Sequence, residues 1–416
     1  MMLDDALKAS SYVDASRLLD SIETLARFGA REDGGVDRPA LSPTDINARR
    51  HLIERAIALG CTVRTDACAN LFFRRAGLEH LPPVMTGSHV DTQPTGGKLD
   101  GCYGVLAGFE CLAALNDAGV QTRRPLEVVA WTNEEGTRFQ PGAMGSSAFV
   151  DPDLLDRYYQ AKDGDGITLA AALATHREAF PTLETRAVEK AAHAFIELHI
   201  EQGPLLELAD IPLGVVKGIQ GVRWYAVRCK GVAAHAGTTP MHARHDAMTL
   251  AVCIRAEIAA FAHQLGGDDT RITFGRWTVL PNSINTIASE VTFSIDFRHP
   301  DPAVLDAFDR KLLDCTTRHA VTSEALFILP PVDFAPAVIQ RVADACHALG
   351  VPSLSITSGA FHDAMYLAKH CPSAMLFVPS RGGISHNPLE ATDDDHLVLG
   401  ARALAHCLVH LCNEAP

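Results

Sequence analysis

Residues 83–101 read PVMTGSHVDTQPTGGKLDG, an apolar run that passes through a histidine into a Pro/Gly-rich loop and ends on a carboxylate and a glycine. The run predicts a buried strand whose carboxyl end carries His89, at the edge where α/β sheets place their ligand sites. Asp91 could then hydrogen-bond the far ring nitrogen of His89. Asp100 leaves two interpretations open: it bridges two cations, or it caps a helix predicted over residues 104–118.

Outward from this stretch, short apolar runs alternate with segments of helical periodicity. The alternation predicts an α/β domain with a mixed central sheet flanked by helices. Ser42 and Pro43 are typical of a helix start, and Gly60 of a helix end. The predicted helices are 15–29, 43–60, 104–118 and 338–349, and the predicted strands are 71–74, 83–86, 126–132 and 374–378.

The middle of the chain has a different pattern. Residues 290–298, EVTFSIDFR, alternate apolar and polar side chains, which indicates a strand buried on one face only. The order of strand, helix, strand, strand and helix predicts an inserted ferredoxin-like α+β domain. We therefore expect one domain made of 1–214 with 330–416 and a second over 215–329. The other elements expected here are strands 219–229 and 272–280 and helices 243–265 and 302–319.

The composition is that of an ordinary globular protein, with 47% hydrophobic and 21% charged residues among 416. The formal net charge of −14 disfavours nucleic acid and anionic membranes as partners, because both recruit clustered cations. We find no secretory signal and no apolar run approaching the roughly 20 residues that span a bilayer. The 11 cysteines are dispersed without a CxxC pair, which favours reduced thiols and a cytoplasmic enzyme.

A pair of carboxylates, Glu134 and Glu135, follows the predicted strand 126–132 in the segment WTNEEGTRF. Adjacent carboxylates repel each other unless a cation or a proton lies between them, although an isolated pair is more often a solvated acidic loop. Neighbouring side chains of extended backbone point opposite ways. One of the two can then bind metal while the other faces the substrate as general base.

Two more histidines lie in comparable positions. His199, in ELHIEQGPLLE (197–207), follows the alternation of a strand, and His386 lies in the glycine-rich loop SRGGISHNPLEAT (380–392). Glu390 could anchor that loop or its imidazole. Three imidazoles with two or three carboxylates suit two divalent ions, such as Zn²⁺, Mn²⁺ or Co²⁺, that share one carboxylate. No thiol cluster suggests a structural zinc, and no GxSxG or Walker motif competes.

In order and wording, these segments resemble the metal-dependent aminoacylase/carboxypeptidase superfamily of zinc peptidases, in its amidase/hydantoinase/carbamoylase branch. The motifs GSHxDT…DG, EE, HIEQGP and GGISH occur in the family's order, and the resemblance extends from about residue 20 to 412. It implies two divalent metal ions per subunit, Zn²⁺ or else Mn²⁺, Co²⁺ or Ni²⁺. Glu134 matches the family's general base, with Asp91 as an orienting neighbour of the site. The implied metal ligands are His89, Asp100 as the bridge, Glu135, His199 and His386.

The resemblance also implies that residues 215–329 form a lid and dimerisation domain. Within it, His235 of GVAAHAGTTPM matches a histidine that reaches into the partner subunit's site and stabilises the tetrahedral intermediate. Asn285 and Arg298 match groups that hold the substrate's carboxylate and carbonyl, and a guanidinium can grip a carboxylate with two hydrogen bonds. From the residues alone, these two are a loop asparagine and a surface arginine. Further substrate contacts are implied for Gln202, Gly359 and His362.

Within that branch, the expected substrate is a small ureido compound: an N-carbamoyl-L-amino acid, or N-carbamoyl-β-alanine as in a β-ureidopropionase. The products would be the amino acid, CO₂ and ammonia. Allantoate amidohydrolase is the alternative, and an N-acyl amino acid or dipeptide hydrolase is a third. A non-catalytic metal-binding protein on the same scaffold is a different class, and the presence of Glu134 weighs against it. We expect a homodimer formed through the lid domain.

Overall fold

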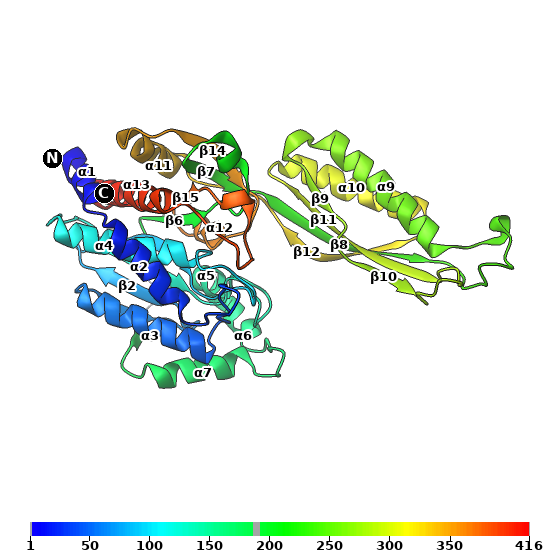
Figure 1. Cartoon of the computed structure of the whole chain (residues 1–416), viewed down its shortest axis with the longest axis horizontal. Helices are drawn as coiled ribbons and strands as arrows, with labels where there is room; N and C mark the ends of the chain where they lie inside the picture. The colour runs from blue at the N-terminus through cyan, green and yellow to red at the C-terminus, as the bar shows by residue number, and fades with distance from the viewer. Residues whose placement is uncertain (1, 186–191, 416) are drawn as a thin grey trace. The chain divides into compact units, whose positions relative to one another are not determined.

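The computed structural model describes residues 2–185 and 192–415 and divides into two compact units. Unit 1 comprises Met1–Lys217 with Asp333–Pro416, and unit 2 comprises Gly218–Val332 (Figure 1). Both domain boundaries, 217/218 and 332/333, lie three residues beyond those expected from the sequence. The main-chain N–H of Phe334 donates to the carbonyl of Lys217 at 3.0 Å, so the chain leaves and re-enters unit 1 at adjacent points.

Unit 1 is built on a ten-stranded sheet with the order β13-β7-β15-β6-β3-β4-β2-β1-β5, and β14 pairs with β7. The central strands β15, β6, β3 and β4 are parallel, whereas β7 and β2 pair antiparallel with β15 and β4. The predicted mixed sheet of an α/β domain is therefore confirmed. The strands are β1 Thr62–Thr65, β2 Leu71–Arg75, β3 Val84–His89, β4 Leu126–Trp131, β5 Glu184–Thr185, β6 Ala194–Ile200, β7 Leu213–Ile219, β13 Val332–Asp333, β14 Ser353–Ser358 and β15 Ser373–Val378.

Helices flank this sheet. The helix α4 is buried along almost its whole length, because CYGVLAGFECLAALND is apolar on nearly all sides. The last helix, α13, packs along α1 and α4 (Figure 1) and was not predicted, because its apolar residues also surround the helix and hide the period. The helices of unit 1 are α1 Met2–Ser11, α2 Ala15–Ala26, α3 Pro43–Ala58, α4 Cys102–Asp117, α5 Met144–Val150, α6 Leu155–Tyr158, α7 Leu169–Ala179, α8 Leu205–Ala209, α11 Pro336–Ala348, α12 Ala364–Leu367 and α13 Asp394–Asn413.

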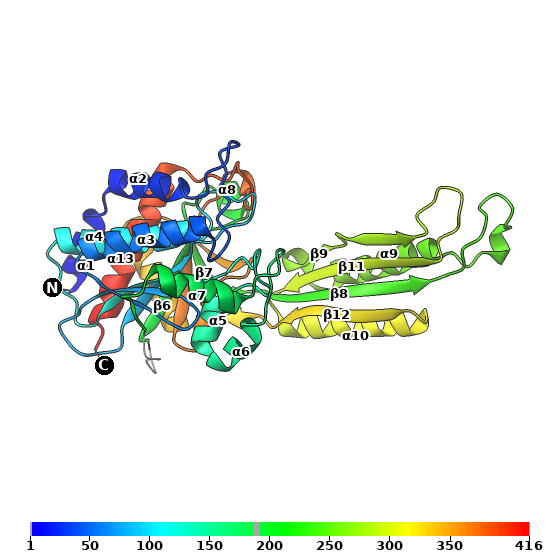
Figure 2. The ribbon, with the colours of Figure 1, turned by 90° about the horizontal axis from the view of Figure 1, so that it is seen from below.

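Unit 2 has an antiparallel sheet in the order β10-β11-β8-β12, with β9 paired to β11, and two long helices. In Figure 2 the strands β8 and β11 run side by side along its length. On β11, the residues Val291, Phe293, Ile295 and Phe297 are buried, as the alternation predicts. The predicted strand 272–280 is wrong in one respect, because it is two short strands. The elements are β8 Gly221–Lys230, α9 Ala247–Leu265, β9 Arg271–Thr273, β10 Trp277–Leu280, β11 Glu290–His299, α10 Pro302–Arg318 and β12 Thr322–Leu329.

Among the described residues, α9 is the one helix long and apolar enough, by length and composition, to cross a membrane. Ala251, Ile254 and Ile258 of this helix are buried in the hydrophobic core of unit 2. The helix also carries Arg255 and Glu257. The buried face of α9 therefore packs in the core of unit 2, as expected of a helix that covers a sheet. All eleven cysteines are free.

Candidate metal and active site

The predicted metal ligands of unit 1 meet at the carboxyl edge of the parallel strands. His89 is the last residue of β3 and lies opposite Trp131, the last residue of β4. The turn that follows β4 carries Glu134 and Glu135. His199 is the penultimate residue of β6, which pairs with β3 on its other side. Parallel pairing therefore brings three separate segments to one edge of the sheet.

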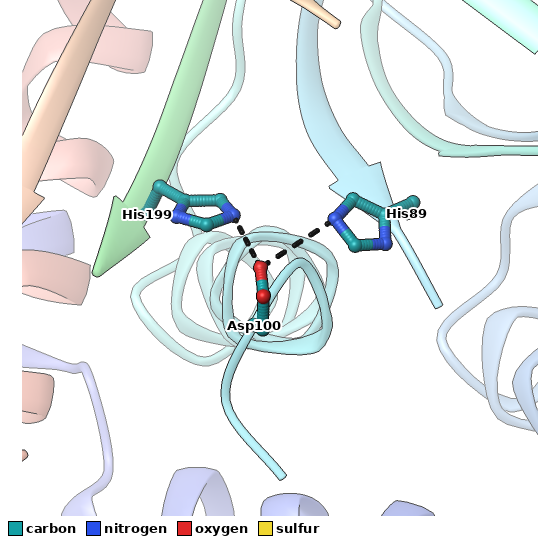
Figure 3. A group of neighbouring side chains, drawn as sticks. All are labelled: His89, Asp100 and His199. Carbon is teal, nitrogen blue, oxygen red and sulfur yellow. Dashed lines mark ion pairs between the residues drawn. The ribbon is translucent and has the colours of Figure 1, made fainter. Parts of the chain in front are cut away.

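Asp100 lies between the imidazoles (Figure 3). Its Oδ1 is 3.2 Å from Nε2 of His199 and 3.7 Å from Nε2 of His89. Its Oδ2 is 3.2 Å from Nε2 of His386, in the loop after β15. The interpretation of Asp100 as a helix cap is wrong, because the N-cap of α4 is Gly101, without a side-chain cap.

Gly101 is needed for the approach of His89 to Asp100. Its φ is +65°, a left-handed conformation that favours glycine. A Cβ at this position would lie 2.4 Å from the ring of His89. The glycine that follows the bridging carboxylate therefore leaves room for the neighbouring imidazole.

Main-chain carbonyls orient two of the rings. Nδ1 of His89 lies 2.8 Å from the carbonyl of Asp91, and Nδ1 of His199 lies 2.9 Å from that of Ile200. With Nδ1 as the donor to a carbonyl, each ring in its neutral form presents the lone pair of Nε2 to the side of Asp100.

The predicted hydrogen bond of Asp91 with the far ring nitrogen of His89 is present, and it is made by the main-chain carbonyl of Asp91. The Asp91 carboxylate has other partners. Its two oxygens accept the main-chain N–H groups of Glu134 and Glu135, each at 3.2 Å. Asn133 has φ +56°, and this turn aims both amides back at Asp91. Asp91 thus positions the glutamate pair, and its own carbonyl positions His89.

The two glutamates point to different imidazoles. Oε2 of Glu134 is 3.4 Å from Nε2 of His89, and Oε2 of Glu135 is 3.6 Å from Nε2 of His386. They diverge because of the turn, and not by the alternation of extended backbone. Gln93, which the sequence analysis did not single out, donates its main-chain N–H and its side-chain amide to Glu135, at 3.1 and 2.6 Å.

Burial raises the pKa of three of these four carboxyl groups, Asp91, Glu134 and Glu135, but not that of Asp100. It raises the pKa of Glu134 well above the usual range, and the nearby Asp363 raises it further. Burial also raises the pKa of Glu135 to about 8 and that of Asp91 to about 7. The pKa of Asp100 is lowered well below its usual value, because hydrogen bonds from His199 and His386 outweigh its burial.

The pKa values of the three imidazoles do not shift in one direction. A hydrogen bond to Asp100 raises the pKa of His386 to about 9. Burial opposes protonation of His199, but its hydrogen bond to Asp100 outweighs this and raises its pKa to about 9. Burial lowers the pKa of His89 to about 4. The cluster therefore gathers four carboxyl groups, three of them with a raised pKa, beside two imidazoles that favour protonation.

The donor atoms fall into two groups that suit divalent cations: His89, Asp100 and His199, and Asp100, Glu135 and His386, each within 4.8 Å of one another. Ligands 2.0–2.1 Å from a tetrahedral Zn²⁺ lie about 3.3 Å apart, close to the spacing of these atoms. Within residues 2–185 and 192–415, no Lys or Arg forms an ion pair with Asp100, Glu134 or Glu135. The residues thus fit two cations that share Asp100.

A third buried group, made of Glu197, His199 and His362, has a different role. Glu197 already accepts hydrogen bonds from the hydroxyl of Ser88 at 2.6 Å and from the main-chain N–H of Ala364 at 2.8 Å. It therefore ties the residue before His89 to the loop that carries His362.

The other predicted contacts of unit 1 lie beside this cluster. Nε2 of Gln202 donates to Oδ2 of Asp100 at 2.9 Å. The ring of His362 packs edge-on against that of His199, with 4.5 Å between centroids, and its Nε2 lies 3.0 Å from the hydroxyl of Ser358. Gly359, in the same loop, is exposed.

The predicted residues of unit 2 lie at two places. The exposed His235 accepts the main-chain N–H groups of Gly237 and Thr238 at Nδ1, at 3.0 and 3.2 Å. The N–H of Ala236 donates to the carbonyl of Asn285 at 2.9 Å, so this asparagine lies beside the His235 loop.

Arg298 lies elsewhere, on β11. Two of its nitrogens donate to the two carboxylate oxygens of Asp296, at 2.9 and 2.8 Å. The register of β11 with β8 pairs Arg298 with Val222 and pairs Glu290 with Lys230. The arginine and the His235 loop are therefore at opposite ends of the sheet.

Comparisons with known proteins agree with this geometry. The family model described as Peptidase family M20/M25/M40 matches residues 85–410. The chain is 35% identical to the N-carbamoyl-L-amino-acid amidohydrolase of Rhizobium meliloti, over 95% of this chain and 96% of that protein. It is 36% identical to the allantoate amidohydrolase of Bacillus subtilis (strain 168), over 95% and 97%. An amidase of the hydantoinase/carbamoylase family from Burkholderia multivorans matches with a TM-score of 0.91 and 41% identity, over 97% and 99%.

Proposed function

Since the chain belongs to peptidase family M20/M25/M40 and is an amidohydrolase of that family, we propose that it hydrolyses the carbamoyl C–N bond of an N-carbamoyl-L-amino acid or N-carbamoyl-β-alanine. The products are the amino acid, CO₂ and ammonia. One observation carries the proposal: Glu134 is a buried carboxylate that belongs to neither donor group yet lies 3.4 Å from a ligand of one of them. A protein that only stored metal would not need it.

Glu134 acts as general base and then as general acid. It takes a proton from the attacking water, whose oxygen adds to the ureido carbonyl carbon, and returns the proton to the leaving nitrogen as the C–N bond breaks. The carbamic acid released then decomposes to CO₂ and ammonia. Two divalent ions, Zn²⁺ or else Mn²⁺, Co²⁺ or Ni²⁺, would supply polarisation of the carbonyl and acidification of the water. They would be held by His89, Asp100, Glu135, His199 and His386.

Residues of unit 2 hold the substrate. Its carboxylate binds to the guanidinium of Arg298, which exchanges Asp296 for the ligand. Nδ1 of His235 is occupied as an acceptor by two main-chain amides, so its Nε2 carries the ring's proton and donates to the developing oxyanion. Asn285 contacts the substrate beside His235. Gln202 and His362 of unit 1 supply further substrate contacts.

The same residues support a homodimer. Glu290 and Arg298 are eight residue steps apart on β11, a distance of about 26 Å at 3.3 Å per residue. His235 and Asn285 lie in loops beyond the Glu290 end, several times the length of a ureido substrate away from Arg298. One copy of unit 2 therefore cannot offer both groups to one substrate, but two copies in a dimer can. The eleven free thiols support a reducing, cytoplasmic environment.

The test is ammonia release after reconstitution with Zn²⁺, Mn²⁺ or Co²⁺, on N-carbamoyl-L-, N-carbamoyl-D- and N-carbamoyl-β-amino acids, with allantoate in parallel. The expected result is turnover of an L- or β-carbamoyl amino acid. Preferred turnover of allantoate would replace this substrate with the alternative, which a relative of 36% identity favours. Release of an amino acid from N-acyl amino acids or dipeptides, without ammonia from any ureido compound, would refute the proposal.

A further inference from the structure

We propose that Glu390 is a positioning residue, whose one buried carboxylate sets the distance between the bridging Asp100 and the loop that carries His386. The inference rests on the function proposed above, because it concerns how the chain holds its own metal ligands. It goes further in assigning a task to a side chain that touches neither metal nor substrate.

The hydrogen bonds of Glu390 join two segments that are far apart in the sequence. The side chain is buried, and its Oε1 accepts the main-chain N–H groups of Leu99 and Asp100, both at 3.0 Å. Its Oε2 accepts the hydroxyl of Ser385 at 2.9 Å. Asp100 belongs to both donor groups, and Ser385 immediately precedes His386. The carboxylate of Glu390 thus connects the bridging Asp100 to the residue that precedes His386.

His386 is the ligand that most needs such support. Its side chain is 51% exposed, whereas those of His89 and His199 are 2% and 1% exposed. The two buried rings are held by strands and by packing. A half-exposed ring on a glycine-rich loop has few such contacts, so its position depends on the hydrogen bonds of the loop.

Gln202 extends the connection into a small network. Its Nε2 donates to Oδ2 of Asp100 at 2.9 Å and to the hydroxyl oxygen of Ser385 at 3.0 Å. The Ser385 hydroxyl therefore accepts from Gln202 while it donates to Glu390. Removal of the Glu390 carboxylate would leave that hydroxyl free to turn away and would leave two buried amides without their acceptor.

The glycine-rich loop before Asp100 is shaped around this carboxylate. A Cβ at Gly97 would lie 2.2 Å from Oε1 of Glu390 and 2.5 Å from its Cβ. Each of the three closest contacts is an atom of the Glu390 side chain. Alanine at position 97 should therefore displace Glu390 without any change in the ligands themselves.

The experiment is calorimetric titration of the metal-free full-length protein with Zn²⁺, together with steady-state kinetics at several Zn²⁺ concentrations. The variants are E390A, E390Q, G97A and the double variant G97A/E390A. The matched control is E110A, which removes a different buried carboxylate of unit 1 that also accepts a main-chain N–H, from Asp14 at 2.8 Å. A binding defect that E110A does not share belongs to the Glu390 network and not to lost stability in general.

We expect wild type to bind two ions and E390A to bind one of them about tenfold to a hundredfold more weakly, as is usual when a partner of a ligand is lost. Its kcat should recover at high Zn²⁺ with KM unchanged. E390Q should restore the affinity, because its carbonyl keeps both amides and its NH₂ can donate to Ser385. G97A should behave like E390A, and the double variant should be no worse than either.

Wild-type affinity in E390A, or additive losses in the double variant, would overturn the proposal. If E390A does not fold, S385A takes its place, since it removes only the hydroxyl link. An S385A protein with wild-type affinity would then overturn it as well. A wild-type chain that binds no divalent ion would instead contradict the proposed function, which separates the two failures.

Discussion

The separation of Arg298 from His235 within unit 2 predicts which pairs of inactive subunits can restore one another. The separation along β11 is about 26 Å, so in the proposed dimer the two groups that act on one substrate would come from different subunits. His235 and Asn285 are neighbours and come from the same subunit. Each of H235A, N285A and R298A should alone lower kcat/KM to roughly one hundredth of wild type.

The expected recovery follows from counting sites. In a heterodimer of H235A with R298A, one site receives the intact Arg298 of one subunit and the intact His235 of the other, and the second site receives neither. Random exchange gives about half heterodimers, so an equal mixture should recover about one quarter of the wild-type activity per site. In a mixture of H235A with N285A, every site lacks one of the two groups, and activity should not recover.

The assay is ammonia release from mixtures of differently tagged homodimers, before and after exchange, with heterodimers isolated by successive affinity steps on the two tags. The isolated H235A/R298A heterodimer should have about half the activity of wild type. Equal recovery in both mixtures would contradict the inference that Arg298 and the His235 loop at one site come from different subunits. Absence of recovery in the isolated H235A/R298A heterodimer would refute the shared site.

The remaining predictions concern the metal cluster and stability. Glu134→Gln should leave the metal content unchanged and lower kcat by about 10²–10⁴, and unchanged turnover would remove its assignment as base. Chelation should abolish turnover and lower the melting temperature, and added Zn²⁺, Mn²⁺ or Co²⁺ should restore both, as calorimetry can show. Gly101→Ala should weaken Zn²⁺ binding, because the new Cβ would lie 2.4 Å from the ring of His89, and wild-type affinity would contradict this. A hydrogen bond from Lys311 lowers the pKa of Glu257 to about 2, below its ordinary value. Its stabilisation is therefore complete above that ordinary value and is lost as the pH falls toward 2. The unfolding free energies of wild type and E257Q should differ at pH 7 and converge in acid.

The sequence predicted the parts of the site that depend on strand order. A histidine at the end of an apolar run must lie at the carboxyl edge of a sheet, and parallel strands share that edge, so His89 and His199 could be placed together. The bridging position of Asp100 was left open by the spacing alone. It is favoured because further candidate ligands occur at 134–135, 199 and 386.

The details that the sequence does not specify depend on turns whose torsions spacing does not encode. Asp91 hydrogen-bonds His89 through its main-chain carbonyl, because its carboxylate faces two main-chain amides in the turn where Asn133 adopts φ +56°. The hydrogen bonds that Gln93 donates to Glu135 depend on the same turn. In unit 2, the expected strand 272–280 is interrupted at 274–276, and its two halves pair with different ends of β11. Apolar pattern predicts that a segment is extended, but it does not predict where it breaks.

The hydrogen bond between Phe334 and Lys217 has a consequence for how this chain can be rebuilt. The ends of the 218–332 segment leave unit 1 at adjacent points, so a short linker could close the gap without strain on the large sheet. We therefore expect that unit 2 can be exchanged as one continuous segment. Replacing residues 218–332 with those of a relative would exchange Arg298, His235 and Asn285 in one operation, while the metal-ligand candidates of unit 1 stayed the same. Substrate preference could then evolve by replacement of one continuous stretch of the chain.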